Sequence, residues 1–348
     1  MALLPSPKSE SVVAFGTGKE LTLRIARRGK DRSILLVALN RPRVKNAFND
    51  EQYLDLISVL QHASIDDSIA AVVLTGEGSY FTSGADLKET NLLPEDDDED
   101  EGGSGKSGML GKPPGRFMME LIKFPKIICS AVNGPTVGIG VTLLLHCDLC
   151  YCTEDATFWA PFTRLALVPE LCSSKTFVDT MGLSKANDLL ILGKKIDAIT
   201  AVRNNICSDI IIGCDKSGNP FEDHSIGSKM CREIDERLIS LPLGDKTSKV
   251  RCALFIGICP LIRYCLYSKV RDCNFFQSLY TYSDFCSLSF NFVYRTKIFV
   301  SMIRSRRRNE MEKVCKEELL KLDERVASGE TLEASMQLNF GSSRRSKL

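Results

Sequence analysis

Three short segments carry the residue types that chemistry on a carbonyl group would use: SGAD at 83–86, GIG at 138–140 and the Glu170 segment VPELC. Glycine lacks a Cβ atom, so glycine-rich turns let main-chain N–H groups approach a ligand closely. Two such groups aimed at one oxygen stabilise a developing negative charge by about 3–4 kcal/mol each. A carboxylate such as Glu170 can remove a proton from one carbon and return it to another. Each segment alone is typical of an ordinary turn, but the two glycine-rich turns together and in this order make that interpretation less favoured.

Apolar strands that alternate with amphipathic helices must position these segments. Because each apolar strand needs helices to cover its faces, this order predicts a layered α/β fold. Strands are recognised by short apolar or alternating runs, and helices by apolar residues at helical spacing. The predicted strands lie at 21–25, 33–39, 70–76 and 126–134, and the predicted helices at 51–62, 117–124, 184–193 and 228–241.

The composition is that of a globular chain without a strong charge bias. The chain has 348 residues, 44% of them hydrophobic, which is enough for a sizeable core. With 45 basic and 44 acidic residues, no nucleic-acid or anionic-membrane partner is expected. The first residues lack the basic start and apolar run of a signal peptide, so we do not expect secretion. The 14 cysteines are irregularly spaced, and we interpret them as reduced thiols with no metal site.

Two segments depart from this globular pattern. Residues 94–114 combine a run of acids with a Gly/Ser stretch, which predicts a disordered surface loop. Residues 251–300 are rich in cysteine and aromatic residues, and their apolar run contains Pro260 and Arg263, so no membrane span is expected. A sequence foreign to the working protein, such as a translated intron, is the favoured interpretation of 251–300. The expected layout is a tail at 1–19, a core at 20–250, the anomalous insert at 251–300, a helical segment at 301–345 and a terminal tripeptide at 346–348.

Three longer motifs carry a resemblance to a known family. They are NRPRVKNA at 40–47, GSYFTSGADLKE at 78–89 and NGPTVGIGVTLLLHCDLCYC at 133–152. The chain resembles the crotonase (enoyl-CoA hydratase/isomerase) superfamily, and residues 156–177 resemble its peroxisomal Δ3,Δ2-enoyl-CoA isomerases. This resemblance implies an α/β crotonase-type spiral of ββα units with C-terminal helices, and a homotrimer or hexamer.

The resemblance also implies a reaction and a site. The substrate is a 3-enoyl-CoA thioester, whose double bond moves to the 2-trans position through an enolate without any further cofactor or metal. The Ala85 and Ile139 N–H groups would hold the enolate oxygen, and Glu170 would move the proton. The residues expected to contact the substrate are Lys45, Ala47, Ser83, Gly84, Asp86, Leu87, Lys88, Gly138 and Gly140.

Other positions separate the possible activities within the family. Hydratases use two glutamates to hold water, and this chain has Thr142 and Phe162 at the matching positions, which favours the isomerase. Leu171 replaces the glycine that usually follows the catalytic glutamate, so a side chain is expected near the acyl group. The segment 194–211 is a poor match to the family's usual helix and strand.

The last three residues indicate a cellular location. Ser346, Lys347 and Leu348 match the tripeptide that the peroxisomal import receptor recognises, which predicts a peroxisomal protein. Other functions remain open: a dienoyl-CoA isomerase, which would need a further acid that is not visible in the sequence, a hydratase, or a non-catalytic acyl-CoA-binding protein.

Overall fold

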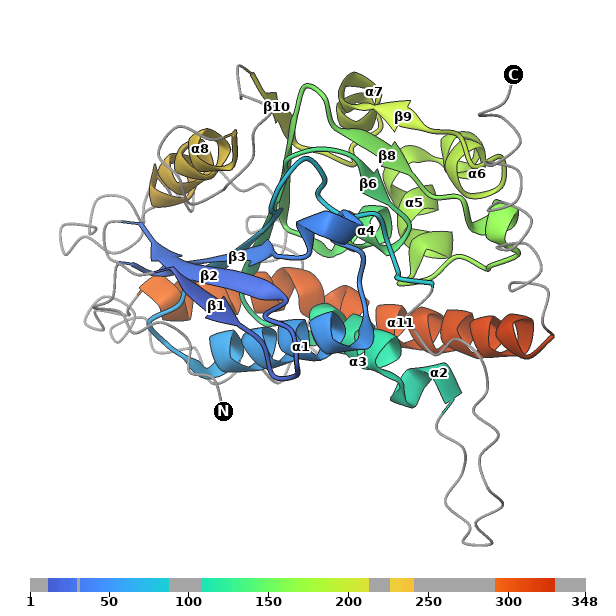
Figure 1. Ribbon diagram of the computed structural model, residues 1–348, viewed down its shortest axis with the longest axis horizontal. Helices are drawn as coiled ribbons and strands as arrows, with labels where there is room; N and C mark the ends of the chain where they lie inside the picture. Colours follow the sequence, from blue (N-terminus) through green and yellow to red (C-terminus); the bar gives the residue numbers. More distant parts are fainter. Residues whose placement is uncertain (1–11, 30–31, 88–107, 213–225, 241–291, 329–348) are drawn as a thin grey trace, which may run out of the picture.

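The computed structural model describes residues 12–29, 32–87, 108–212, 226–240 and 292–328. Within them, the main structural element is a seven-stranded sheet with the strand order β1-β2-β3-β4-β5-β7-β10 (Figure 1). The pairs β1–β2 and β2–β3 are antiparallel, and all later neighbours are parallel. The strands are β1 Val13–Phe15, β2 Leu23–Arg28, β3 Ile34–Leu39, β4 Ala71–Gly76, β5 Ile127–Val132, β7 Leu149–Thr153 and β10 Asp209–Ile211.

A small second sheet and a set of helices complete the fold. The small sheet has the order β6-β8-β9, with β6 and β8 parallel and β9 antiparallel to β8. The remaining strands are β6 Thr136–Val137, β8 Thr157–Trp159 and β9 Ile196–Asp197. The helices are α1 Asp50–Ile65, α2 Gly108–Gly111, α3 Pro113–Lys123, α4 Ile139–Thr142, α5 Ser173–Met181, α6 Leu183–Leu190, α7 Ala198–Arg203, α8 Ile226–Ser240 and α11 Phe292–Ala327, with 3-10 turns η1 Pro42–Val44, η2 Leu143–His146 and η3 Phe162–Leu165.

Helices cover both faces of the main sheet, which explains why β3 is apolar and buried at every position. In β3, Ile34 and Leu36 pack in a cluster with Ile234 of α8. The alternating residues Leu35 and Val37 belong to the larger core on the opposite face, where α1, α3 and α11 lie. Successive side chains of a strand point to opposite faces, so a strand between two helical layers must be apolar at every position.

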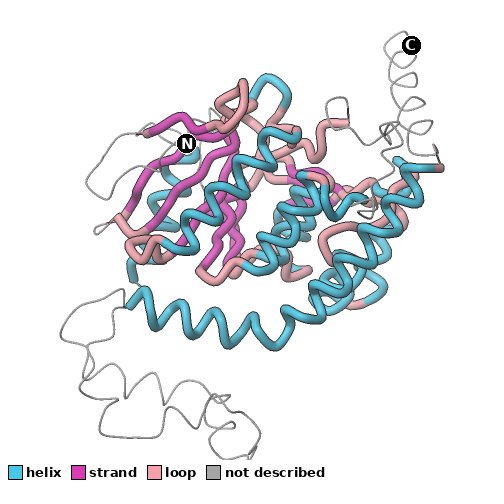
Figure 2. The backbone as a smooth tube through the Cα atoms, turned by 90° about the horizontal axis from the view of Figure 1, so that it is seen from below, coloured by secondary structure: helices cyan, strands magenta, loops and turns pink. Residues whose placement is uncertain are grey.

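The long helix α11 connects distant parts of this larger core. Figure 2 shows it running along the whole helical side of the molecule. Its buried residues recur three or four positions apart, as expected for one face of a helix. These residues are Met311, Cys315, Leu319, Leu322 and Val326. On the same helix, Asp323 accepts a hydrogen bond at 2.7 Å from the Met109 N–H of α2.

The strands and helices predicted from sequence are confirmed, but three predicted boundaries are wrong. Part of the expected tail 1–19 belongs to the fold, because β1 pairs with β2 and the Thr17 hydroxyl donates to Asp55 of α1 at 2.6 Å. Residues 108–114 are helical in α2 and α3, so the loop predicted at 94–114 is too long at its end. The helix α11 begins at Phe292 and runs across the boundary predicted between 300 and 301.

Other predictions for these segments lie outside the described residues. They concern residues 94–107 and 251–291, Lys88 and the terminal tripeptide. Among the described helices, none has the length and apolar character needed to cross a bilayer.

Candidate active site

The first glycine-rich turn contains Ala85 and is anchored beside the first residues of α1. Phe48 and Ala85 form a parallel bridge in which the Phe48 N–H donates to Gly84 O and the Asp86 N–H donates to Phe48 O, both at 2.8 Å. In such a bridge the N–H of the central residue points away from the partner strand. Among the described residues, no acceptor takes the Ala85 N–H. It is therefore available to a ligand.

The second glycine-rich turn contains Ile139 and lies against the first. An ideal Cβ atom on Gly138 would lie 3.9 Å from the Gly84 Cα, and one on Gly84 would lie 3.0 Å from Val137 O. Both glycines have positive φ, +55° and +91°. Ile139 is the first residue of α4, where an N–H has no acceptor within the helix, and no other acceptor takes it in the described part of the chain. The structure thus places two unused N–H groups on adjacent turns.

Gly140 has a packing role at this junction. A Cβ atom there would lie 2.2 Å from the Thr82 Cγ2 and 3.0 Å from the Thr136 Cγ2. Thr82 and Thr136 form a bridge between the two turns. Gly140 therefore contributes by letting the turns approach, because a larger residue would separate them.

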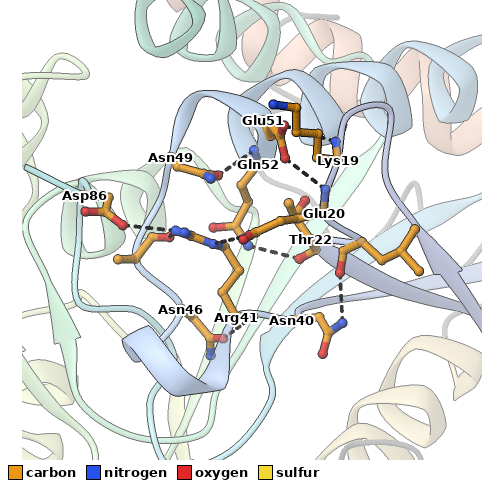
Figure 3. Close-up of polar contacts among 12 residues, drawn as sticks. Lys19, Glu20, Thr22, Asn40, Arg41, Asn46, Asn49, Glu51, Gln52 and Asp86 are labelled. Carbon is orange, nitrogen blue, oxygen red and sulfur yellow. Dashed lines mark hydrogen bonds and ion pairs between the residues drawn. The ribbon is translucent and has the colours of Figure 1, made fainter. Parts of the chain in front are cut away.

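A buried polar network holds the first turn in place (Figure 3). The Arg41 Nη1 donates to Ala47 O at 2.7 Å and to the Asp86 Oδ2 at 3.1 Å, and the Arg41 Nε donates to the Glu20 Oε2 at 3.0 Å. The Arg41 N–H donates to the Asn46 side chain, which in turn donates to Glu77 O and Tyr80 O. The ion pair with Arg41 therefore fixes Asp86, which is the residue next to Ala85.

The expected substrate-contacting residues fall into two groups. Gly84, Gly138, Gly140, Ser83 and Ala47 lie in or directly beside the two turns, and the Ser83 N–H donates to Lys45 O at 2.9 Å. Lys45 and Leu87 are exposed, and the Lys45 ammonium lies 5.0 Å from the centre of the Tyr80 ring. An exposed ammonium near these turns is suited to a phosphate.

Glu170 lies between η3 and α5, on an unusual piece of backbone. Leu171 and Cys172 both have left-handed conformations, with φ of +53° and +59°. Such conformations cost non-glycine residues about 1–2 kcal/mol. The turn is held by the Ser173 N–H, which donates to Glu170 O at 3.1 Å, and by a contact of 2.9 Å between the His146 Nε2 and Leu171 O. His146 ends the helical segment that begins at Ile139, so the Glu170 turn is attached to the second glycine-rich turn.

Leu171 shows why glycine is usual at its position. A left-handed φ favours glycine, yet Leu171 is fully buried and packs in the larger core. Burying a leucine side chain contributes about 1.5–3 kcal/mol, which can offset the backbone cost. The side chain of Leu171, which was expected near the acyl group, therefore packs in the larger core of this chain.

The electrostatic environment of Glu170 suits acid/base chemistry. The side chain is half-buried, and burial, followed by repulsion from Glu318, raises the pKa of its carboxyl from 4.5 to about 8. Burial also raises the pKa of Tyr53 of α1 well above its usual value, and the Glu170 charge adds to this shift. A carboxyl that titrates near neutral pH can both accept and return a proton.

Glu318 is a site residue that sequence reasoning missed. Its side chain is only 6% exposed, and burial raises the pKa of its carboxyl to about 7, although hydrogen bonds from Ser174 lower it. It lies on α11, and in the sequence it looks like any other charge on a charged helix. The only available signal is its position three residues after Cys315, on the buried face of that helix.

The two positions that distinguish hydratases carry no carboxylate. The Thr142 hydroxyl is buried and donates to Ile139 O at 3.2 Å, and Phe162 is buried in the larger core. Across the described ranges, no group of three or more histidine, cysteine or acidic side chains is arranged to hold a metal ion. The segment 194–211, a poor match in sequence, does form a helix and a strand, and its strand β10 extends the main sheet next to β7.

Comparisons with known proteins agree with this architecture. The spiral of strands and helices with two adjacent glycine-rich turns defines a crotonase-type α/β protein, as predicted. Residues 29–212, more than half of the chain, match the family model described as "Enoyl-CoA hydratase/isomerase". The chain belongs to the enoyl-CoA hydratase/isomerase family.

Individual relatives are similar over part of their length. The chain is 39% identical over 210 residues to "Enoyl-CoA delta isomerase 2" of Homo sapiens, covering 60% of this chain and 52% of that protein. It is 36% identical over 213 residues to "Enoyl-CoA delta isomerase 3, peroxisomal" of Mus musculus, covering 60% and 65%. The chain therefore spans between about half and two thirds of these relatives. An enoyl-CoA hydratase/isomerase from Pseudoalteromonas atlantica T6c superposes with a TM-score of 0.63 at 26% identity, covering 92% of this chain and 97% of that one.

Proposed function

We propose that this protein moves the double bond of a 3-enoyl-CoA to the 2-trans position, with Glu170 as its single acid/base. The observation that carries the proposal is the Glu170 carboxyl, half-buried on a turn attached to the Ile139 helix and with its pKa raised to about 8. The delta isomerase names of the two relatives described above support the same reaction class. The residues at the site fit each step of this reaction.

The mechanism follows from the positions of the donors and the base. The Glu170 carboxylate takes a proton from C2, and the electron pair of that C–H bond moves to the thioester oxygen to give an enolate. The Ala85 and Ile139 N–H groups donate to this oxygen, which stabilises the charge by about 3–4 kcal/mol per donor. Glu170 then returns the proton to C4 while the C2–C3 double bond forms and the carbonyl is restored. No atom is gained or lost.

The raised pKa of Glu170 favours this chemistry. A carbon acid next to a thioester is weak, so a base with a pKa near 8 removes its proton more effectively than an ordinary carboxylate. The same environment makes the protonated carboxyl a competent acid for the return step. Thr142 and Phe162 offer no second carboxylate to activate water, which favours isomerisation over hydration.

Location and assembly complete the proposal. The terminal Ser346, Lys347 and Leu348 and the printed name of the mouse relative support a peroxisomal location in fatty-acid β-oxidation. Assembly into a homotrimer or hexamer is proposed on the resemblance to the superfamily. The exposed Lys45 beside the first turn is proposed to contact the CoA portion of the substrate.

The test compares the unmodified protein with Glu170→Gln, using a 3-enoyl-CoA substrate. We expect kcat to fall by about 10²–10⁴-fold while CoA binding, measured by calorimetry, is retained. Glu154→Gln changes an exposed glutamate and serves as the control, with no expected loss. Full turnover in Glu170→Gln would rule out the proposed mechanism. If the unmodified protein binds CoA but turns over no 3-enoyl-CoA, it is an acyl-CoA-binding protein.

A second candidate function is favoured by Glu318. A dienoyl-CoA isomerase would need a further acid, and the structure contains a second buried carboxyl that interacts with Glu170. Turnover of a 3,5-dienoyl-CoA substrate in the same assay measures this activity. If Glu318→Gln abolishes dienoyl turnover but not 3-enoyl turnover, the second candidate is supported.

A further inference from the structure

We propose that Glu318 is a positioning residue, by which the C-terminal helix α11 holds the Glu170 turn and disfavours the charged form of Glu170. This inference rests on the proposed function, because it concerns the proton-transferring group of that reaction. Glu318 is separated from Glu170 by most of the C-terminal half of the chain and is brought to it only by the packing of α11.

The contacts of Glu318 place it at the start of α5, directly after the Glu170 turn. Its Oε1 accepts from the Ser174 N–H at 3.0 Å and from the Ser174 hydroxyl. The preceding residue, Ser173, donates its N–H to Glu170 O. Two consecutive main-chain N–H groups therefore serve different partners: that of Ser173 donates to the Glu170 carbonyl, and that of Ser174 donates to the Glu318 side chain.

Glu318 also supplies a cap that α5 lacks in its own sequence. The N-cap residue Cys172 has a left-handed conformation and makes no side-chain cap hydrogen bond. The first N–H groups of a helix need acceptors, and a negative group near them is favoured by the helix dipole. The Glu318 carboxyl meets this need from a helix 144 positions later in the chain.

Two further contacts attach α11 to the same turn. The Cys172 thiol donates to Met311 O at 3.1 Å, and Lys175 forms an ion pair of 3.1 Å with Glu310. Together with Glu318, they hold Cys172, Ser174 and Lys175 against one face of α11. The left-handed turn that carries Glu170 is thus stabilised by tertiary contacts.

The second carboxylate oxygen provides the electrostatic part of the argument. Glu318 Oε2 is buried and, among the described residues, makes no hydrogen bond of normal geometry, although the Cys172 N–H is near enough to lower the pKa of this carboxyl. A buried charge interacts strongly with nearby charges because little water screens it. Repulsion from Glu318 accordingly contributes to the raised pKa of Glu170, after burial.

Other titratable groups near Glu170 and Glu318 lie on α1, at the end of η2 and on α11. Tyr53 of α1 interacts with Glu170 and also with Asp50. His146 contacts the carbonyl of Leu171. On the α11 side, Lys321 lowers the pKa of Glu318, and the Cys172 thiol interacts with Glu318 and with the thiol of Cys315. Both causes of the shift at Glu170, burial and the Glu318 charge, raise its pKa, and none of these groups offsets them there.

The experiment measures the pH dependence of kcat/KM in Glu318→Gln. Glutamine keeps an oxygen that can accept from Ser174, so the cap is retained while the negative charge is removed. We expect the acid limb of the profile to move down by on the order of one pH unit, with KM changed less than about twofold. At pH values below the midpoint of the acid limb, kcat/KM is expressed as a fraction of its plateau value. This fraction should be about tenfold higher in Glu318→Gln than in the unmodified protein.

Matched variants separate charge from structure. Glu317→Gln removes an exposed carboxylate next to Glu318 on the same helix, whose ion pair is with Lys313 of α11, and its profile should equal that of the unmodified protein. Glu318→Ala removes cap and charge, so it should also lower the midpoint of chemical denaturation, and by more than Glu318→Gln does. If Glu318→Gln does not fold, Ser174→Ala replaces it: loss of a donor makes Glu318 more neutral and should shift the limb in the same direction.

An unchanged profile in Glu318→Gln overturns the proposal and leaves Glu318 as a helix cap only. Failure of the proposed function is detected separately, as absence of 3-enoyl-CoA turnover in the unmodified protein. In that case, the titration of Glu170 is followed by infrared spectroscopy, using the protonated carboxyl band that is lost in Glu170→Gln. A downward shift of this titration in Glu318→Gln supports the proposal without turnover, and no shift overturns it.

Discussion

The two halves of the candidate site are stabilised in different ways. The donor half, formed by the turns around Gly84 and Gly138, is held by bridges, by close backbone contact and by the buried Arg41 network. The proton-transfer half carries Glu170 on two left-handed non-glycine residues, and α11 contacts it from far along the chain. The donor half thus depends on backbone geometry, whereas the proton-transfer half depends on the docking of a distant helix.

This difference suggests how each half would fail. A change in the donor half should move main-chain N–H groups, which no side chain can replace. A change in the proton-transfer half should alter the charge and orientation of one carboxyl while leaving the donors in place. Stability and pH measurements can therefore distinguish the two halves.

The largest effect is expected from Arg41→Met in the donor half. Removing the guanidinium leaves the Asp86 carboxylate and the Ala47 carbonyl without this buried partner. Breaking a buried ion pair from one side costs about 3–5 kcal/mol. Chemical denaturation measures the loss, and the exposed Arg43→Met serves as control with a change below about 0.5 kcal/mol. Equal effects of the two substitutions would contradict the role assigned to the network.

A smaller effect is expected from Gly84→Ala compared with Gly182→Ala. Both glycines have a positive φ, +91° and +83°, so both substitutions incur a backbone cost of about 1 kcal/mol. Only at Gly84 does the added Cβ atom meet a neighbour, Val137 O at 3.0 Å, while nothing lies within 4 Å at Gly182. Crowding should add about 1–2 kcal/mol at Gly84 and should lower kcat by displacing the Ala85 N–H. Unchanged kcat in Gly84→Ala would argue against Ala85 as a donor.

The smallest effect concerns the pH dependence of stability in Glu170→Gln. The folded-state pKa of Glu170 is about 8, above the ordinary 4.5, so between these values the folded protein holds a proton that the unfolded chain has released. Stability is therefore lost as pH rises through this window, and Gln does not titrate. Relative to the unmodified protein, Glu170→Gln should become more stable by on the order of 1–2 kcal/mol between about pH 7 and pH 9. Denaturant unfolding at both pH values checks this, and a constant difference would show that Glu170 titrates normally.

Much of the donor half was predictable from sequence. Glycines at 84, 138 and 140 indicated turns with close backbone approach; the structure gives Gly84 and Gly138 a positive φ, and an added Cβ atom would be crowded at Gly84 and Gly140. The strands of the main sheet were also predictable, because apolar residues at every position of β3 require a sheet with helices on both faces. Such signals are local, so a single segment contains them.

The proton-transfer half was predictable only in part. Glu170 was identified by the motif around it, but neither the left-handed backbone at Leu171 and Cys172 nor the role of Glu318 is visible in the sequence. Leucine and cysteine disfavour a positive φ, so local preference predicts the wrong backbone there. Tertiary contacts with α11 outweigh that preference.

The sequence by itself therefore determined the alternation of strands and helices and the two glycine-rich turns, and it was enough to propose Glu170 as the acid/base, because these depend on residue type and short spacing. Only the tertiary structure decided that α11 contacts the Glu170 turn, that a second buried carboxyl lies beside it, and that both carboxyls titrate near neutral pH. The physical reason is that burial and charge repulsion depend on which groups become neighbours in space, and Glu318 reaches the start of α5 at Ser174 from 144 positions further along the chain.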